Sequence, residues 1–195
     1  MDIVTDDALV SPVSDSELID YAKLDSDDQT VSTVLLSATS IVFAFLKQDL
    51  LTRTWTLTYK DWPICGTDTY PSLSRQNYAY KQRIELPYTN LLSVTSVTVN
   101  GELFTDYEIV KGKPYLLDFD SIGYANDDSD ALVVVYDAGF GALASDVPQP
   151  IRNAILMTAT YLHSHNGMCD FGDALSMSGA KQLLTPYAVK AGIVI

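Results

Sequence analysis

The chain has 195 residues, of which 47% are hydrophobic, and it carries 25 acidic residues against 12 basic ones, a net charge of −13. This composition excludes global disorder and predicts one domain, or one domain with an insertion, around a real core. It argues against DNA binding through phosphates, which requires a basic surface. Nine of the acids fall in residues 1–30. The acid excess indicates either solubility through charge repulsion or a surface that DNA passes without sticking.

The sequence contains no sign of a membrane or secretory segment. No run reaches the roughly 18 apolar residues that a bilayer span requires. The first residues, MDIVTDDALV, lack the basic and apolar regions of a signal peptide. Cys65 and Cys169 lie far apart and form no CxxC motif, so we expect both thiols to be reduced. We therefore expect a soluble intracellular protein with no membrane contact.

The N-terminal part is expected to be an acidic arm over residues 1–14, followed by helices over 15–51. Ser14 and Glu17 have the spacing of a capping box, in which each residue satisfies a free amide of the other. This pair predicts that a short helix starts directly after Ser14.

The segment VSTVLLSATSIVFAFL, residues 31–46, repeats apolar side chains at helical spacing and predicts a second helix. Leu36, Phe43 and Ala44 lie off the main stripe, so a second face of this helix is also apolar. Either the rest of the chain or a neighbouring subunit covers that face. For Phe43 we favour packing within the chain.

From residue 52 the apolar period changes to two, which predicts an inserted antiparallel β region over 52–138. In RTWTLTY, Trp55 and Leu57 alternate with threonines. Asn100-Gly101 between alternating runs predicts a hairpin, because both turn residues must accept positive φ. The polar and aromatic stretch 61–81 is expected to be a long excursion from the sheet.

Helix is expected to resume near 148–150, Pro-Gln-Pro, because proline suits a first helical turn. An apolar stripe follows and predicts one long C-terminal helix over 147–166, which ends at Asn166-Gly167. Residues 167–195 are expected to form a tail with an apolar end. The predicted fold class is α+β, a helical bundle of N-terminal helices and one long C-terminal helix with the β region inserted.

We find no catalytic constellation in the sequence. His163 and His165 lie near Cys169 and Asp170, but residues two apart on a helix face away from each other and cannot share a metal. The stretch AGFGA, 138–142, lacks the spacing of a dinucleotide or phosphate loop. There is no Gly-x-Ser-x-Gly elbow. We therefore predict no enzyme activity, no cofactor and no metal site.

Several segments occur in an order that is typical of one family. They include the stretches IELPYTNLLSVTSVTVNG, LVVVYDAGFG and VPQPIRNAILMTATYLHSHNG, with LLTRTWTLTYKDWP before them and LLTPY after them. In this order and over roughly residues 15–187, the chain resembles the tailed-phage head–tail connector, or adaptor, family, whose members are often named DNA-packaging proteins. The patterns that carry the resemblance are LPxxxLxSVTSVxVxG, VxYxAGFG and VPxxIRxAIL.

The resemblance implies a closed ring, commonly of about twelve subunits, docked beneath the portal protein at the capsid vertex. Such a ring extends the DNA channel and joins the head to the next neck or tail protein. Double-stranded DNA would pass through without specific binding. The implied location is the head–tail junction of the virion, reached after assembly in the host cytoplasm. The alternatives are another neck or tail-completion protein, such as a stopper, or a ligand-binding or hydrolytic α+β protein.

Two segments are candidates for docking. The hairpin at Asn100 and Gly101 would let the β region project as a platform for the next neck or tail protein, unless the sheet only seals the second face of the helices. The C-terminal tail would contact the portal or an adjacent subunit, for example by adding a strand to a partner's sheet, unless it folds back on its own bundle. The tail residues predicted to dock are Leu183, Leu184, Tyr187, Ile193 and Val194.

Overall fold

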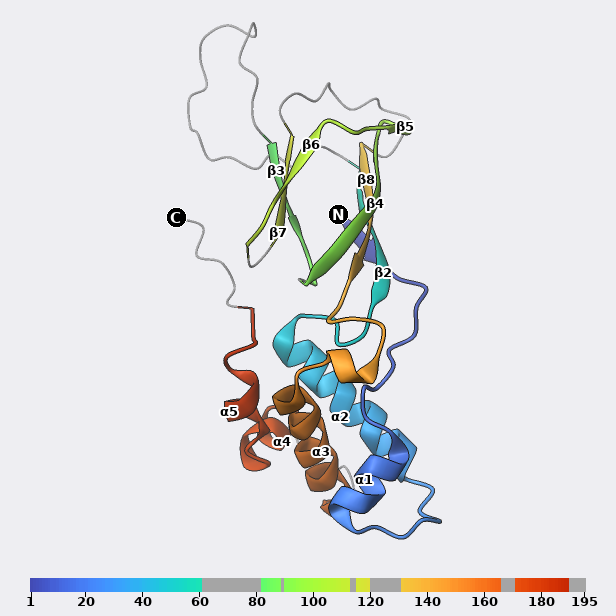
Figure 1. The fold of residues 1–195 in the computed structure, drawn as a ribbon, viewed down its shortest axis with the longest axis vertical. Helices are drawn as coiled ribbons and strands as arrows, with labels where there is room; N and C mark the ends of the chain where they lie inside the picture. Colours follow the sequence, from blue (N-terminus) through green and yellow to red (C-terminus); the bar gives the residue numbers. More distant parts are fainter. Residues whose placement is uncertain (61–81, 89, 113–114, 120–130, 166–170, 190–195) are drawn as a thin grey trace, which may run out of the picture. The chain divides into compact units, whose positions relative to one another are not determined.

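A computed structural model describes residues 1–60, 82–88, 90–112, 115–119, 131–165 and 171–189. These residues divide into two compact units. Met1–Asp6 and Thr54–Asp137 form the unit that contains the sheets, named here the β unit. Residues 7–53 and 138–189 form the helical unit (Figure 1).

The helical unit is built around one central helix. The helix α3 contacts every other helix of the unit, with α1 and α2 on one side and α4 and α5 on the other (Figure 1). The helices are α1 (Asp15–Ala22), α2 (Val31–Leu46), α3 (Gln149–Ser164), α4 (Phe171–Met177) and α5 (Ala180–Leu184). A short 3-10 turn, η1 (Ala144–Asp146), precedes α3.

The helices begin and end where the local sequence dictates. Ser14 and Glu17 form the predicted capping box at the start of α1, with the amide of Glu17 donating to Ser14 Oγ at 3.3 Å. Lys23 and Lys47 end α1 and α2 in the left-handed conformation, at φ 53° and 52°. Proline in the first turn of α3 also agrees with the prediction.

The predicted apolar stripes form the core of the helical unit. On α3, the four residues Ile151, Ile155, Ala159 and Leu162 are buried. The inner face of α2 packs in the same cluster, through residues that include Leu35, Val42 and Leu46. Helical spacing therefore identified the buried faces of both helices correctly.

The β unit contains a five-stranded sheet of order β1-β2-β8-β4-β5 and a three-stranded sheet of order β3-β7-β6. Trp55 and Leu57 on β2 are buried, as their alternation with threonines predicted. The strands are β1 (Asp2–Val4), β2 (Arg53–Tyr59), β3 (Gln82–Leu86), β4 (Leu91–Val99), β5 (Glu102–Leu103), β6 (Tyr107–Val110), β7 (Tyr115–Phe119) and β8 (Leu132–Ala138).

The Asn100-Gly101 hairpin is confirmed. β4 and β5 pair antiparallel, with Val99 opposite Glu102, and the two turn residues have φ values of 50° and 82°. Positive φ at both positions is the geometry that favours Asn-Gly. The returning strand is only two residues long, because the chain then leaves for the other sheet, where β6 pairs with β7.

Two expectations about the chain ends need correction. The segment predicted as an N-terminal arm over 1–14 contains a strand, since β1 pairs with β2 over Thr56–Thr58. α3 corresponds to the helix predicted over 147–166, but the segment predicted as a tail from residue 167 contains two further helices, α4 and α5. Ala174 and Leu175 of α4 are buried in the core of the helical unit. Tertiary packing therefore stabilises this helix, which is too short to be predicted from its sequence alone.

Some predictions lie outside the described residues. They are the 61–81 excursion, the thiols of Cys65 and Cys169, the helix stop at 166–167, Asp170, and the tail residues Ile193 and Val194. Among the described residues, no helix combines the length and apolarity needed to cross a membrane.

Candidate interaction surfaces

The predicted platform hairpin is anchored at its base and open at its turn. The amide of Asn100 donates to the carbonyl of Ala131 at 3.1 Å, and that of Phe104 donates to Val97 at 2.8 Å. Gly101 is exposed, and a Cβ at this position would meet no atom within 4 Å. Leu103 beside the turn is 70% exposed. The hairpin therefore presents a fixed turn with one apolar side chain in solvent.

The docking residues predicted in the tail differ in burial. Leu184 is fully buried in the core of the helical unit, and Leu183 and Tyr187 pack partly against it. The side chain of Gln48 donates to the carbonyl of Tyr187 at 2.5 Å, and the amide of Val189 donates to that of Leu46 at 3.3 Å. The chain as far as Val189 thus folds onto its own unit, the alternative that the sequence left open, and Leu184 is a core residue.

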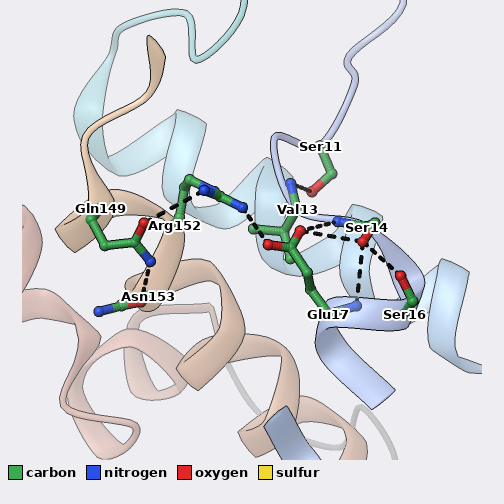
Figure 2. Close-up of polar contacts among 8 residues, drawn as sticks. All are labelled: Ser11, Val13, Ser14, Ser16, Glu17, Gln149, Arg152 and Asn153. Atoms are coloured by element: carbon green, nitrogen blue, oxygen red, sulfur yellow. Dashed lines mark hydrogen bonds and ion pairs between the residues drawn. The ribbon is translucent and has the colours of Figure 1, made fainter. Parts of the chain in front are cut away.

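A polar network joins α1 to α3 (Figure 2). One carboxylate oxygen of Glu17 accepts from the amide of Ser14 at 2.9 Å, while the other accepts from Arg152 Nη2. The hydrogen bond from the Ser14 amide is the main cause that lowers the pKa of the Glu17 carboxyl, and the Arg152 guanidinium adds to it. Glu17 therefore serves both as a helix cap and as a tie to α3.

A second contact joins the end of α3 to the loop before α2. His163 Nε2 lies 2.7 Å from Asp28 Oδ2, while Asp28 Oδ1 accepts from the side chain and the amide of Thr30 at 2.6 and 2.8 Å. The Thr30 bonds, followed by the His163 contact, lower the pKa of Asp28 to about 2. His163 lies in the last turn of α3. Its partner lies 135 residues away, so no local pattern could reveal it.

A third pair lies where α2 leads into β2. Arg53 Nη1 lies 3.1 Å from Oδ1 of the fully buried Asp49, and Nη2 donates to the carbonyl of Asp7 at 2.8 Å. The guanidinium also lies 5.8 Å from the centre of the Phe43 ring. Phe43 is half-buried under this cation and does not belong to the core cluster.

Among the described residues, these surfaces contain no group of side chains that would form a metal site. Within the described residues, no three His, Cys, Asp or Glu side chains are grouped so that they could hold a metal ion. His165 stacks on Tyr161 with ring centres 4.1 Å apart, and its Nδ1 lies 2.9 Å from the Tyr161 carbonyl. The polar groups described above connect segments of the chain to one another.

Comparison with known proteins gives no match to a family model and none to a curated protein. Solved structures do match over the whole chain. A chain from the neck of an empty gene transfer agent (GTA) particle, computed with C6 symmetry, superposes with a TM-score of 0.72 at 13% identity, covering 100% of this chain and 99% of that one.

Two further chains give the same coverage. One, from the neck of the native GTA particle computed with C12 symmetry, has a TM-score of 0.68 at 14% identity. The other, from the virion of the native particle, has a TM-score of 0.67 at 15% identity. The protein therefore shares its whole fold with chains of a virus-like particle's neck and virion.

Proposed function

We propose that this protein is a structural neck protein of a tailed phage or related particle, which forms a ring beneath the portal and joins the head to the tail. The observation that carries the proposal is the end-to-end correspondence with a chain of the GTA neck, at a TM-score of 0.72. The order of sequence motifs, which resembles head–tail adaptors, supports it independently. The role is one of assembly rather than catalysis.

The charge of the chain suits a channel for DNA. With a net charge of −13 per copy, a ring of many copies offers duplex phosphates few neutralising contacts. DNA would therefore slide through during packaging and ejection without being held. The symmetry of the GTA neck maps, C6 and C12, supports a ring of about twelve copies.

We propose two docking segments, the hairpin of the β unit and the residues beyond Val189. The hairpin at Asn100 and Gly101, with Leu103 exposed beside it, is proposed to meet the next neck or tail protein. The tail beyond Val189, with Ile193 and Val194, is proposed to meet the portal or an adjacent subunit. Leu183 and Tyr187, half-buried against the bundle, would border that contact.

The decisive experiment mixes the purified protein with the portal protein of the same virus and measures the mass of the complex by native mass spectrometry. We expect a portal that carries about twelve copies of this chain. A portal that stays bare would overturn the adaptor role. Binding to a ready-made portal–adaptor complex instead would identify the protein as a stopper or tail-completion protein.

A truncation tests the tail. Removing residues 190–195 leaves the bonds of Tyr187 and Val189 to α2 intact, so the bundle should keep its stability while portal binding is lost. As a matched control, Ile193→Ala with Val194→Ala keeps the main chain and removes the apolar side chains. Binding that survives in this control but not in the truncation would indicate strand addition through the main chain. Unchanged binding in both variants would remove the tail from the interface.

A further inference from the structure

The helix α2 presents an exposed face without charge. Its 16 residues include no Asp, Glu, Lys or Arg, although 19% of the chain is charged. The residues that share this face, named here the α2 outer face, are Thr33, Leu36, Ser37, Ser40, Phe43 and Ala44; all are exposed except the half-buried Phe43. They recur at the three- and four-residue spacing that places side chains on one side of a helix. Leu36 is 48% exposed. A helix face that remains in water usually carries charges.

The two serine hydroxyl groups of this face already have acceptors within the helix. Ser37 Oγ donates to the carbonyl of Thr33 at 2.8 Å, and Ser40 Oγ donates to that of Leu36 at 2.9 Å. A hydroxyl that keeps its hydrogen bond can be buried without the large penalty of an unsatisfied donor. The guanidinium of Arg53, which lies over the Phe43 ring, is paired with Asp49. The α2 outer face can therefore lose its water at small electrostatic cost.

The charge of the whole chain indicates which partner fits. A basic partner would be drawn to the acids that dominate residues 1–30, and the α2 outer face offers it no counter-charge. A second copy of this chain carries the same net charge of −13 and is repelled wherever acidic surfaces meet. An uncharged face is where two such copies approach without opposing carboxylates.

The size of the face also bears on the partner. A helix of 16 residues is ~24 Å long and ~10 Å wide, so one face offers roughly 240 Å². A stable pair of proteins buries about 800 Å² on each partner. The α2 outer face is too small to hold an isolated dimer by itself, but it suits a contact that is repeated around a closed ring.

We propose that the α2 outer face is the surface through which one copy of this chain contacts the next copy in the ring, an inference that rests on the proposed neck function. The test compares two substitutions at the same positions. Ser37→Glu with Ser40→Glu places charges in the contact, while Ser37→Ala with Ser40→Ala keeps it uncharged. Both Glu and Ala favour helix more than Ser does, so each monomer should fold, which circular dichroism and thermal melting would verify. Thr105→Glu, at an exposed position in the β unit, controls for added charge elsewhere.

Native mass spectrometry of each variant with the portal gives the readout. We expect the wild type, the double Ala variant and Thr105→Glu to load many copies, and the double Glu variant to lose at least tenfold in occupancy. Full loading by a folded double Glu variant would overturn the α2 contact and leave the neck function standing. A wild type that loads no copies would overturn both.

A photo-crosslink identifies what covers the face. With p-benzoyl-phenylalanine in place of Ser40, irradiation of the loaded portal should give a product of two copies of this chain. A product that joins this chain to the portal instead would overturn the proposal and assign the face to the portal.

Discussion

The ion pairs between described residues lie in the helical unit, whereas in the β unit the described contacts between segments include stacked aromatic rings. In the helical unit, Asp49 pairs with Arg53, and longer-range pairs connect α1 and the loop before α2 to α3. In the β unit, Trp55 stacks on Tyr88 with ring centres 4.2 Å apart, and the buried Tyr136 donates its hydroxyl to the carbonyl of Pro87 at 2.7 Å.

This difference has a consequence for stability. Carboxylates that are paired in the folded state lose their contribution when acid protonates them, while stacked rings and buried apolar area do not titrate. Acid should therefore loosen the helical unit before the β unit.

Trp55→Ala should give the largest effect and confine it to the β unit. The side chain is buried and stacked on Tyr88, so its loss should lower the free energy of unfolding by about 3–5 kcal/mol. Native-state hydrogen exchange of the amides in β2 and β8, compared with those in α2 and α3, would locate the loss. Trp55→Phe, which keeps a stacked ring, is the control. Equal loss of protection in both units would break the comparison, because the units would then unfold as one.

Gly139→Ala should weaken the helical unit instead. Gly139 has φ 144°, and a Cβ there would lie 2.6 Å from the carbonyl oxygen of Leu51. The segments that contain Leu51 and Gly139 are also held together by a hydrogen bond, in which the amide of Thr52 donates to the carbonyl of Gly141 at 2.9 Å. We expect a loss of about 3 kcal/mol from backbone strain and the clash, measured by chemical denaturation.

Gly101→Ala is the matched control for that clash. Its φ is 82°, but nothing lies within 4 Å of a Cβ at this position, so only the left-handed conformation costs energy, about 1–2 kcal/mol. If both variants lost the same amount, the contact of Gly139 with Leu51 would contribute nothing.

The features that could be predicted are those that depend on neighbours in sequence. The helix over 31–46, the capping box at Ser14 and the hairpin at Asn100-Gly101 each follow from periodicity or turn geometry, and the structure contains all three. The buried faces followed from the same periodicity.

The features that could not be predicted depend on partners distant in sequence. β1 is only three residues long, Asp2–Val4, and it is a strand only because β2 is there to pair with it. α4 depends on packing within the helical unit, and the Asp28–His163 contact joins residues 135 positions apart. The burial of Leu184 was missed for the same reason, since an apolar residue near a chain end does not reveal which surface covers it.

Ser14→Ala should have a smaller effect on the helical unit. It removes the hydroxyl that accepts from the amide of Glu17, but the amide of residue 14 still reaches the Glu17 carboxylate. Loss of a helix cap of this kind costs about 1 kcal/mol. Thermal melting followed by circular dichroism at 222 nm, the usual helix band, would measure it. Ser14→Thr, which keeps a hydroxyl that can accept from the amide of Glu17, is the control, and an equal loss there would contradict a specific role for the capping hydroxyl.

The response of stability to pH should be the smallest effect, and it tests the difference between the helical unit and the β unit most directly. The folded-state pKa values of Asp28 and Glu17 lie below their ordinary values of 3.8 and 4.5. Each group therefore contributes stability that is fully present above its ordinary pKa and is lost as pH falls toward the lowered one. For Asp28 the window runs from 3.8 down to about 2. Denaturation of the wild type at a series of pH values should show the helical unit weakening through this range, before the β unit does.

The variant Asp28→Asn measures how much of the change in stability with pH is due to Asp28. The amide cannot titrate, so the variant should be less stable than the wild type near neutral pH and should approach it as the pH falls toward 2. Asp27→Asn makes the same change of charge one residue away, in a side chain that contacts Ser26 rather than His163, and should keep the wild-type slope. An unchanged slope in Asp28→Asn would mean that neither the Thr30 hydrogen bonds nor the contact with His163 makes stability depend on the Asp28 carboxylate. The helical unit would then owe its acid sensitivity to Glu17, which a Glu17→Gln variant measured over the same pH series would show directly.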